Sequence, residues 1–214
     1  MKKNYFRLGS TVPGGLGGPQ TIAFDTLYAY MLSEVSQAFY RCIFIVQIDK
    51  SLDELVHFRK HDNEAHVNLI YPVDPFVDEK SEFERNVIRL DFVHMGMLRL
   101  AAMDDRIKID KLEEVKNYLI ENEFIVDVLY KKIVNKKDKT IIGRVVFNPS
   151  EKVFSFFLII ENFNKERKRY PIGEVLTTEY TEERPYYDGQ WISDQEIFLI
   201  NCLTGQEFNF RSFE

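Results

Sequence analysis

Residues 140–178 read TIIGRVVFNPSEKVFSFFLIIENFNKERKRYPIGEVLTT, and this stretch decides the predicted fold. β-branched and aromatic residues dominate three segments of it, at 140–147, 153–161 and 170–178. Turn-forming or charged residues separate the segments, which is the pattern of consecutive strands that pair antiparallel. We therefore expect a β-meander in the C-terminal half of the chain.

Further strand-like segments lie on both sides of this meander. A strand is favoured at 124–134, where β-branched residues are dense, although a helical spacing of apolar residues nearly continues through it. Residues 197–203 and 207–210 flank Thr204 and Gly205 and predict a closing hairpin. The C-terminal half is thus expected to form a mainly antiparallel sheet.

The N-terminal half contains most of the predicted helices. Ser51 and Glu54 have the spacing of a capping box, which predicts a helix start at this point. From the capping box and the helical spacing of apolar residues, helices are expected at 24–39, at 52–61 and from Asp110 onward. Strands are expected at 41–48 and 67–71, whereas 86–103 is compatible with a helix or a strand.

This order of elements predicts an α+β fold, with a helix-rich N-terminal half packed on a mainly antiparallel sheet formed by the C-terminal half. A chain of 214 residues is long enough to bury one sizeable core. We expect residues 1–214 to form a single α+β domain. A possible subdivision lies near 72–84, where two prolines precede an acidic stretch.

Composition excludes several classes of protein. The formal net charge of −6 argues against a chain that binds nucleic acid or an anionic membrane over its whole surface. The longest apolar runs fall far short of a membrane span, and no apolar stretch follows the first residues as in a signal peptide. Cys42 and Cys202 lie in apolar runs, so both are expected to be buried thiols in a cytoplasmic protein.

The negative charge is concentrated in one stretch. Residues 174–196 contain seven acids and one base, so the rest of the chain is neutral. Aromatic residues beside acids are typical of interfaces with basic partners. The residues predicted to bind a partner are Tyr180, Glu182, Glu183, Tyr186, Tyr187, Asp188 and Trp191. The alternative is a solvated loop whose aromatic rings fold back onto the sheet.

A basic stretch lies earlier, between Lys131 and Arg144, with six bases and one acid. Its simplest role at a hairpin tip is solubility and protection of a sheet edge. A local contact with a phosphate or nucleic acid is the alternative.

Histidines and carboxylates suggest a metal site. Glu54, His57 and His61 would share one face of the helix expected at 52–61, and Asp91 and His94 repeat the carboxylate–histidine spacing. The alternative is a set of scattered surface histidines.

A glycine-rich loop occupies residues 9–18. Gly9 and Gly14 have P-loop spacing, but Gly15 and Leu16 stand where that motif requires lysine and serine or threonine. We therefore expect a mobile surface loop, with ordering on a partner or a small ligand beneath it as alternatives.

The sequence favours a non-enzymatic, cytoplasmic protein-binding module, for example an immunity protein or antitoxin that covers a basic target site with its acidic aromatic loop. We expect a protein partner with a basic surface, rather than a membrane or a nucleic acid, and no cofactor. The alternative is a metal-dependent hydrolase that uses the histidine and carboxylate cluster around residues 54–66.

Overall fold

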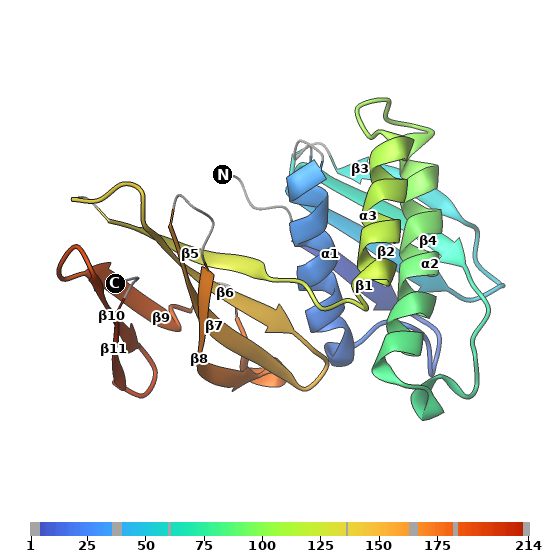
Figure 1. Ribbon diagram of the computed structural model, residues 1–214. Coiled ribbons are helices and arrows are strands. Elements are labelled where there is room, and N and C mark those ends of the chain that lie inside the picture. Colours follow the sequence, from blue (N-terminus) through green and yellow to red (C-terminus); the bar gives the residue numbers. More distant parts are fainter. Residues whose placement is uncertain are drawn as a thin grey trace. The chain divides into compact units, whose positions relative to one another are not determined.

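The computed structural model describes residues 5–35, 40–59, 61–135, 137–162, 167–181 and 184–211. The fold is α+β, as predicted, and contacts divide the chain into two compact units, residues 1–126 and 127–214 (Figure 1). The subdivision considered near 72–84 lies inside the first unit, in the connection that precedes its longest helix. No helix in the described parts of the chain is long and apolar enough to cross a membrane.

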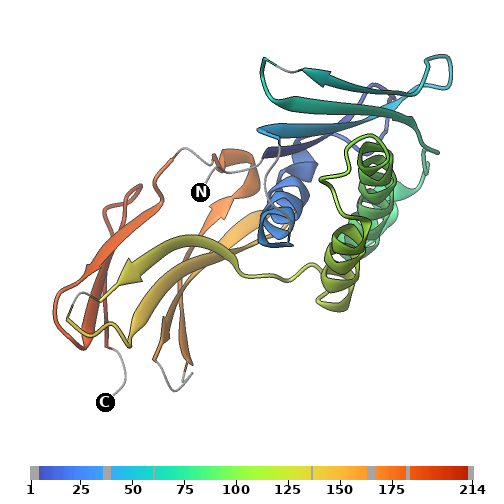
Figure 2. The ribbon, with the colours of Figure 1, turned by 90° about the horizontal axis from the view of Figure 1, so that it is seen from above.

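The N-terminal unit is a four-stranded mixed sheet with helices on one face. Its elements are β1 (Tyr5–Ser10), η1 (Pro19–Thr21), α1 (Ile22–Val35), β2 (Cys42–Ile48), β3 (Leu55–Arg59), β4 (Glu64–Ile70), η2 (Val77–Glu79), α2 (Glu82–Ala101) and α3 (Ile109–Glu121). The strand order is β1-β2-β4-β3, in which only β3 runs antiparallel to its neighbour. Figure 2 shows the helices and the strands of this unit as two layers.

The helices pack on the sheet of their own unit. Ile45, Val67 and Leu69 have no exposed surface and lie on the face toward the helices, where α1 contacts β1 and α2 contacts β4. The N-terminal half is therefore less helix-rich than predicted, because four of its segments are strands that bury the apolar faces of its own helices.

The helix predicted at 52–61 is wrong, because this segment contains β3, which pairs antiparallel with β4. Glu54 does not cap a helix. Its Oε1 accepts a hydrogen bond of 2.9 Å from the Ile70 amide. The capping box is instead formed by Ser81 and Glu84, at the start of α2, so residues 86–101 are helical. Cross-strand pairing has overridden a short local signal.

The C-terminal unit contains two antiparallel sheets. Its elements are β5 (Val128–Val134), β6 (Ile142–Pro149), β7 (Val153–Glu161), β8 (Arg167–Leu176), η3 (Thr177–Glu179), β9 (Tyr187–Trp191), β10 (Glu196–Asn201) and β11 (Glu207–Arg211). The strand orders are β5-β6-β7-β8 and β11-β10-β9. The predicted meander and closing hairpin are confirmed, whereas β9 was not predicted.

Aromatic rings form much of the core of the C-terminal unit. Phe154 and Phe156 of β7 are fully buried. The Phe154 ring centroid lies 4.1 Å from that of Tyr180, and the Phe156 centroid lies 5.1 Å from that of Tyr187. These contacts join β7 to the segment that carries β9.

The two cysteines differ in exposure. Cys42 is buried in β2, as predicted, and burial raises the pKa of its thiol to about 11. Cys202 is exposed, contrary to expectation, because the chain turns immediately after β10.

Candidate functional site

Three of the aromatic residues predicted to bind a partner are buried in the core. Tyr180, Tyr186 and Tyr187 are 9%, 1% and 2% exposed. The Tyr186 hydroxyl accepts a hydrogen bond from the Thr181 amide and donates one to the Glu179 carbonyl, over 2.7 and 3.1 Å. These tyrosines therefore hold the unit together rather than forming a surface. Glu182 and Glu183 lie outside the described residues.

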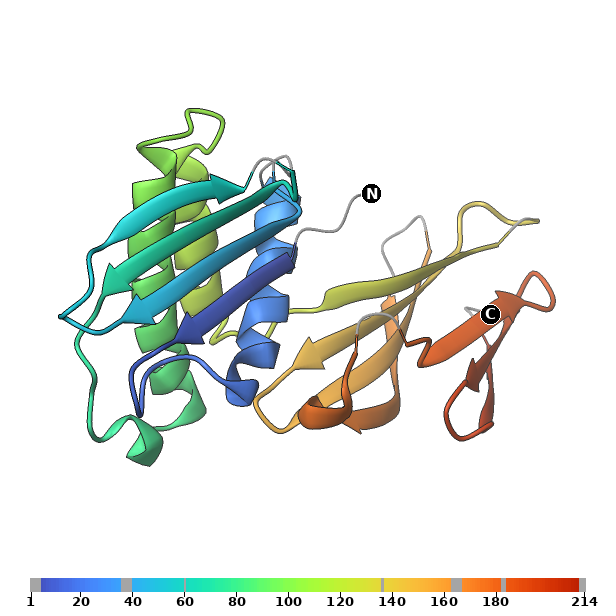
Figure 3. The same ribbon diagram turned by 180° about the vertical axis from the view of Figure 1, so that it is seen from behind.

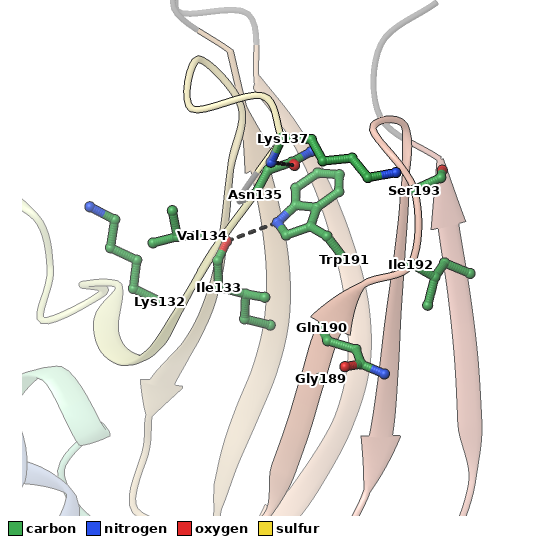
Figure 4. Close-up of a pocket in the computed structure, with 10 residues that line it drawn as sticks. All are labelled: Lys132, Ile133, Val134, Asn135, Lys137, Gly189, Gln190, Trp191, Ile192 and Ser193. Atoms are coloured by element: carbon green, nitrogen blue, oxygen red, sulfur yellow. Dashed lines mark hydrogen bonds between the residues drawn. The ribbon is translucent and has the colours of Figure 1, made fainter.

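Trp191 is placed differently from these tyrosines. It ends β9, is half-buried, and donates a hydrogen bond of 2.9 Å from its indole Nε1 to the carbonyl of Ile133 on β5 (Figure 4). This bond fixes the orientation of the indole while leaving part of the ring accessible. Trp191 is thus the member of the predicted aromatic set that can contact another molecule.

Trp191 lies in a groove of about 660 Å³ between β5 and β9. The groove is lined by Lys132, Ile133, Val134, Asn135, Lys137, Gly189, Gln190, Trp191, Ile192 and Ser193. Figure 4 shows the indole between the two strands, with the Lys137 side chain extending past it toward Ser193. In the same view, Lys132 and Val134 point to the other side of β5. The size is within the range of sites that bind small ligands or partner side chains.

The groove lies where two sheet edges meet. β5 and β9 are each an edge strand of their own sheet. Within the described chain, side chains rather than backbone hydrogen bonds connect these strands. Close to Trp191, the Asn135 Nδ2 donates a hydrogen bond of 3.0 Å to the Asp194 carbonyl. On these two facing edges, the backbone N–H and C=O groups that point toward the other sheet form no strand-to-strand hydrogen bonds within the described chain. Such edge groups are commonly used to bind another polypeptide.

The basic and acidic stretches of the sequence meet at this groove. Lys131 forms an ion pair with Asp188, and Lys137 lies 3.7 Å from Asp194. The hydrogen bond from Lys131 lowers the pKa of Asp188. Both pairs are solvent-exposed, so each contributes little to stability. They do show that part of the acidic stretch is neutralised by lysines of the same chain.

The outer face of the β9-β10-β11 sheet combines apolar side chains with carboxylates. Ile197 and Leu199 of β10 point inward and are fully buried, so the alternate residues Glu196, Phe198 and Ile200 point outward. Asp188 and Glu207 flank Ile200 in the register of the neighbouring strands. This face therefore places half-buried apolar side chains among three carboxylates. Two of them are paired, Asp188 with Lys131 and Glu196 with Arg211, the latter at 3.2 Å.

The residues predicted to hold a metal are not brought together. Glu54 pairs with Arg99 at 2.7 Å, Asp91 pairs with Lys116 at 2.8 Å, and His94 contacts Glu113 at 2.9 Å. His57 stacks on His66 instead, with ring centroids 4.7 Å apart, while His61 lies exposed in a turn.

The metal prediction was wrong in its geometry, because His57 is on a strand rather than on a helix that also carries His61. Among the residues whose positions are described, no three or more His, Cys, Asp or Glu side chains are grouped to hold a metal ion.

The glycine-rich loop is packed around Gln47 of β2. The Gln47 Oε1 accepts hydrogen bonds from the Leu16 amide, at 2.8 Å, and from the Ser10 hydroxyl, at 3.2 Å. Its Nε2 donates to the Tyr71 carbonyl at 3.0 Å. The Gln47 amide therefore fills the space beneath the loop, where a small ligand was the alternative prediction.

Replacing Gly17 by alanine is expected to lower the free energy of unfolding by about 2–3 kcal/mol. A Cβ at Gly17 would lie 2.5 Å from the Gly9 carbonyl carbon and the Ser10 amide nitrogen, so the backbone must shift. Gly9→Ala is the control, because its Cβ would make ordinary contacts with Val46. Equal midpoints of the two variants in urea denaturation would argue against a loop packed in this way.

Comparison with protein-family models, with curated proteins and with solved structures finds no match to this chain.

Proposed function

We propose that this protein is a non-enzymatic, cytoplasmic protein-binding module whose C-terminal unit holds a partner at the groove between β5 and β9. The observation that carries the proposal is Trp191, an indole fixed by its hydrogen bond to Ile133 yet accessible in an open groove. Tryptophan is enriched among the residues that dominate binding energy at protein interfaces. A pre-oriented ring also loses little conformational freedom on binding.

The partner proposed has a basic surface. The outer face of β9-β10-β11 adjoins the groove through β9 and presents Glu207 beside Ile200, with Asp188 and Glu196 in exposed ion pairs with Lys131 and Arg211. Acidic groups around an apolar centre suit a basic partner and accelerate its approach. An inhibitor of the immunity-protein or antitoxin kind, which covers a basic site on its target, is the concrete form of this proposal.

The lining of the groove favours binding over catalysis. Its described residues supply lysines, amides, a serine and apolar side chains. Serine and lysine act as nucleophiles when a neighbouring base or a lowered pKa activates them, and the described lining contains no carboxylate or imidazole to activate Ser193, Lys132 or Lys137.

The test begins with capture of the partner from native cells on the tagged full chain, followed by affinity measurements with the purified partner. Trp191→Ala is expected to weaken binding by about 30-fold or more, as for an interface hot spot. Glu207→Lys is expected to slow association and to reduce its dependence on salt. Leu176→Ala, which alters an exposed apolar residue of β8, is the matched control and should bind as the unaltered chain does.

Circular dichroism of each variant separates a binding defect from unfolding. If folded Trp191→Ala and Glu207→Lys both bind the captured partner within twofold of the unaltered chain, the proposal is wrong.

A further inference from the structure

The N-terminal sheet has a second face, opposite its helices, which no described element of that unit covers (Figure 3). Strand alternation places Phe44 and Val46 of β2, Leu55 of β3 and Ile70 of β4 on this face. Leu55 is 52% exposed and the other three are half-buried. Asn68 of β4 lies between Val46 and Leu55 in the register, so this face presents apolar side chains around a polar one, which is suited to an interaction surface.

Three rings form a row across this face. Phe44, His66 and His57 are direct neighbours in the register of β2, β4 and β3. The Phe44 and His66 ring centroids are 4.5 Å apart, those of His66 and His57 are 4.7 Å apart, and both pairs are nearly parallel. Burial, together with the neighbouring charges of His66 and Arg59, lowers the pKa of His57. The three stacked rings therefore form a continuous row across the face.

The charged groups around this row are mainly cationic. Arg7 on β1 and Arg59 on β3 are exposed at the two edges of the sheet. Glu64 is the one carboxylate that strand alternation places on this face, and it already contacts the His66 Nε2 at 3.3 Å. Glu64 is also the cross-strand neighbour of Arg59, so the strand residues of this face carry a net charge of +1, in contrast to the chain as a whole, which carries −6.

We propose that this face of the β1-β2-β4-β3 sheet docks an acidic polypeptide surface that has apolar side chains at its centre. Carboxylates of the partner would meet Arg7 and Arg59, while its apolar side chains cover Leu55 and the ring row. This surface belongs to the N-terminal unit and takes a partner of opposite charge to the one proposed for the C-terminal unit.

Two other occupants fit the face less well. A second copy placed face to face would bring arginines toward arginines, with Glu64 as the single opposing charge. Single-stranded nucleic acid needs open ring faces on which bases stack, and here the rings stack on one another. Charge and ring geometry together favour the acidic polypeptide.

The experiment is an NMR titration of the ¹⁵N-labelled full chain with two ten-residue peptides, one of alternating glutamate and leucine and one of alternating lysine and leucine. The glutamate peptide is expected to shift amide resonances of β3 and β4, and the lysine peptide to bind at least fivefold more weakly. Arg7→Glu should weaken binding of the glutamate peptide at least fivefold. Lys152→Glu makes the same charge change in the exposed β6–β7 turn and should leave binding unaltered.

Equal binding of the two peptides, or no binding of either at millimolar concentration, would overturn the proposal. Tighter binding of a ten-nucleotide oligothymidine would assign the face to nucleic acid, and a dimer in sedimentation that Arg7→Glu dissociates would assign it to a second copy. Either outcome also overturns it. Trp191→Ala should leave the peptide titration unchanged, so this test and that of the C-terminal groove fail separately.

Discussion

Replacing Tyr187 by alanine is expected to lower the free energy of unfolding by about 3–5 kcal/mol, the usual cost of removing a large buried ring. Tyr187 is 2% exposed and packs against Phe156. Its hydroxyl donates a hydrogen bond of 2.9 Å to the Ile172 carbonyl and accepts one of 3.3 Å from Asn201. The loss combines a cavity with two unpaired polar groups. Urea denaturation followed by fluorescence measures it, because the single tryptophan lies in the same unit.

Two further variants separate the ring from its hydroxyl and from the charge beside it. Tyr187→Phe keeps the ring and should cost about 1–2 kcal/mol, since only the hydrogen bonds are lost. Asp188→Ala removes the neighbouring exposed carboxylate and should change the free energy of unfolding by less than about 1 kcal/mol. A loss of less than about 1 kcal/mol in Tyr187→Ala would mean that Tyr187 is a surface residue, as its sequence context suggested.

Replacing Asp25 by asparagine is expected to stabilise the protein above neutral pH by about 2–4 kcal/mol relative to the unaltered chain. Asp25 is buried at the start of α1, where it accepts hydrogen bonds from the Leu8 amide at 3.2 Å and the Thr21 hydroxyl at 3.3 Å. Burial raises the pKa of this carboxyl from 3.8 to about 7, although these hydrogen bonds and nearby arginines oppose the shift.

The sign of the pH dependence follows from this shift. Between pH 4 and 7 the folded state keeps a proton on Asp25 that the unfolded state releases, so this group destabilises the fold progressively as pH rises. Asparagine does not titrate, so the advantage of Asp25→Asn should grow from pH 4 to 7 and level off above.

Urea denaturation of both proteins at several pH values between 4 and 8 measures this difference. Asp49→Asn is the matched control. The Ser51 amide holds the pKa of Asp49 below 3.8, so its effect on the free energy of unfolding should stay constant between pH 5 and 8. A pH-independent difference for Asp25→Asn would show that Asp25 is already ionised in the folded protein at pH 5.

Regular periodicity made most of the fold predictable. The meander at 140–178 and the helix from Asp110 follow directly from the alternation or helical spacing of their apolar residues. β9 was missed because its residues resemble a turn, with Asp188 and Gly189 in sequence. The structure shows why a strand needs glycine here: a Cβ at Gly189 would lie 2.4 Å from the Phe198 carbonyl oxygen.

The candidate site was predictable only in part. Trp191 could be selected from its type and its acidic surroundings, but the burial of Tyr186 and Tyr187 depends on β7, which is distant in sequence. Tyrosine is compatible with a core or an interface, so local context could not decide between them. One signal was available: the lysines after Tyr130 and the acids of 174–196 have opposite charge, and the structure pairs Lys131 with Asp188.

Hydrogen–deuterium exchange of the full chain, with and without its captured and purified partner, tests the proposed binding site most directly. Amides of 131–135 and 187–201, in the strands that form the groove and in β10, should exchange more slowly in the complex. Trp191→Ala should abolish this protection at the same partner concentration. Protection confined to other parts of the chain, with these strands unchanged, would contradict a partner site between β5 and β9.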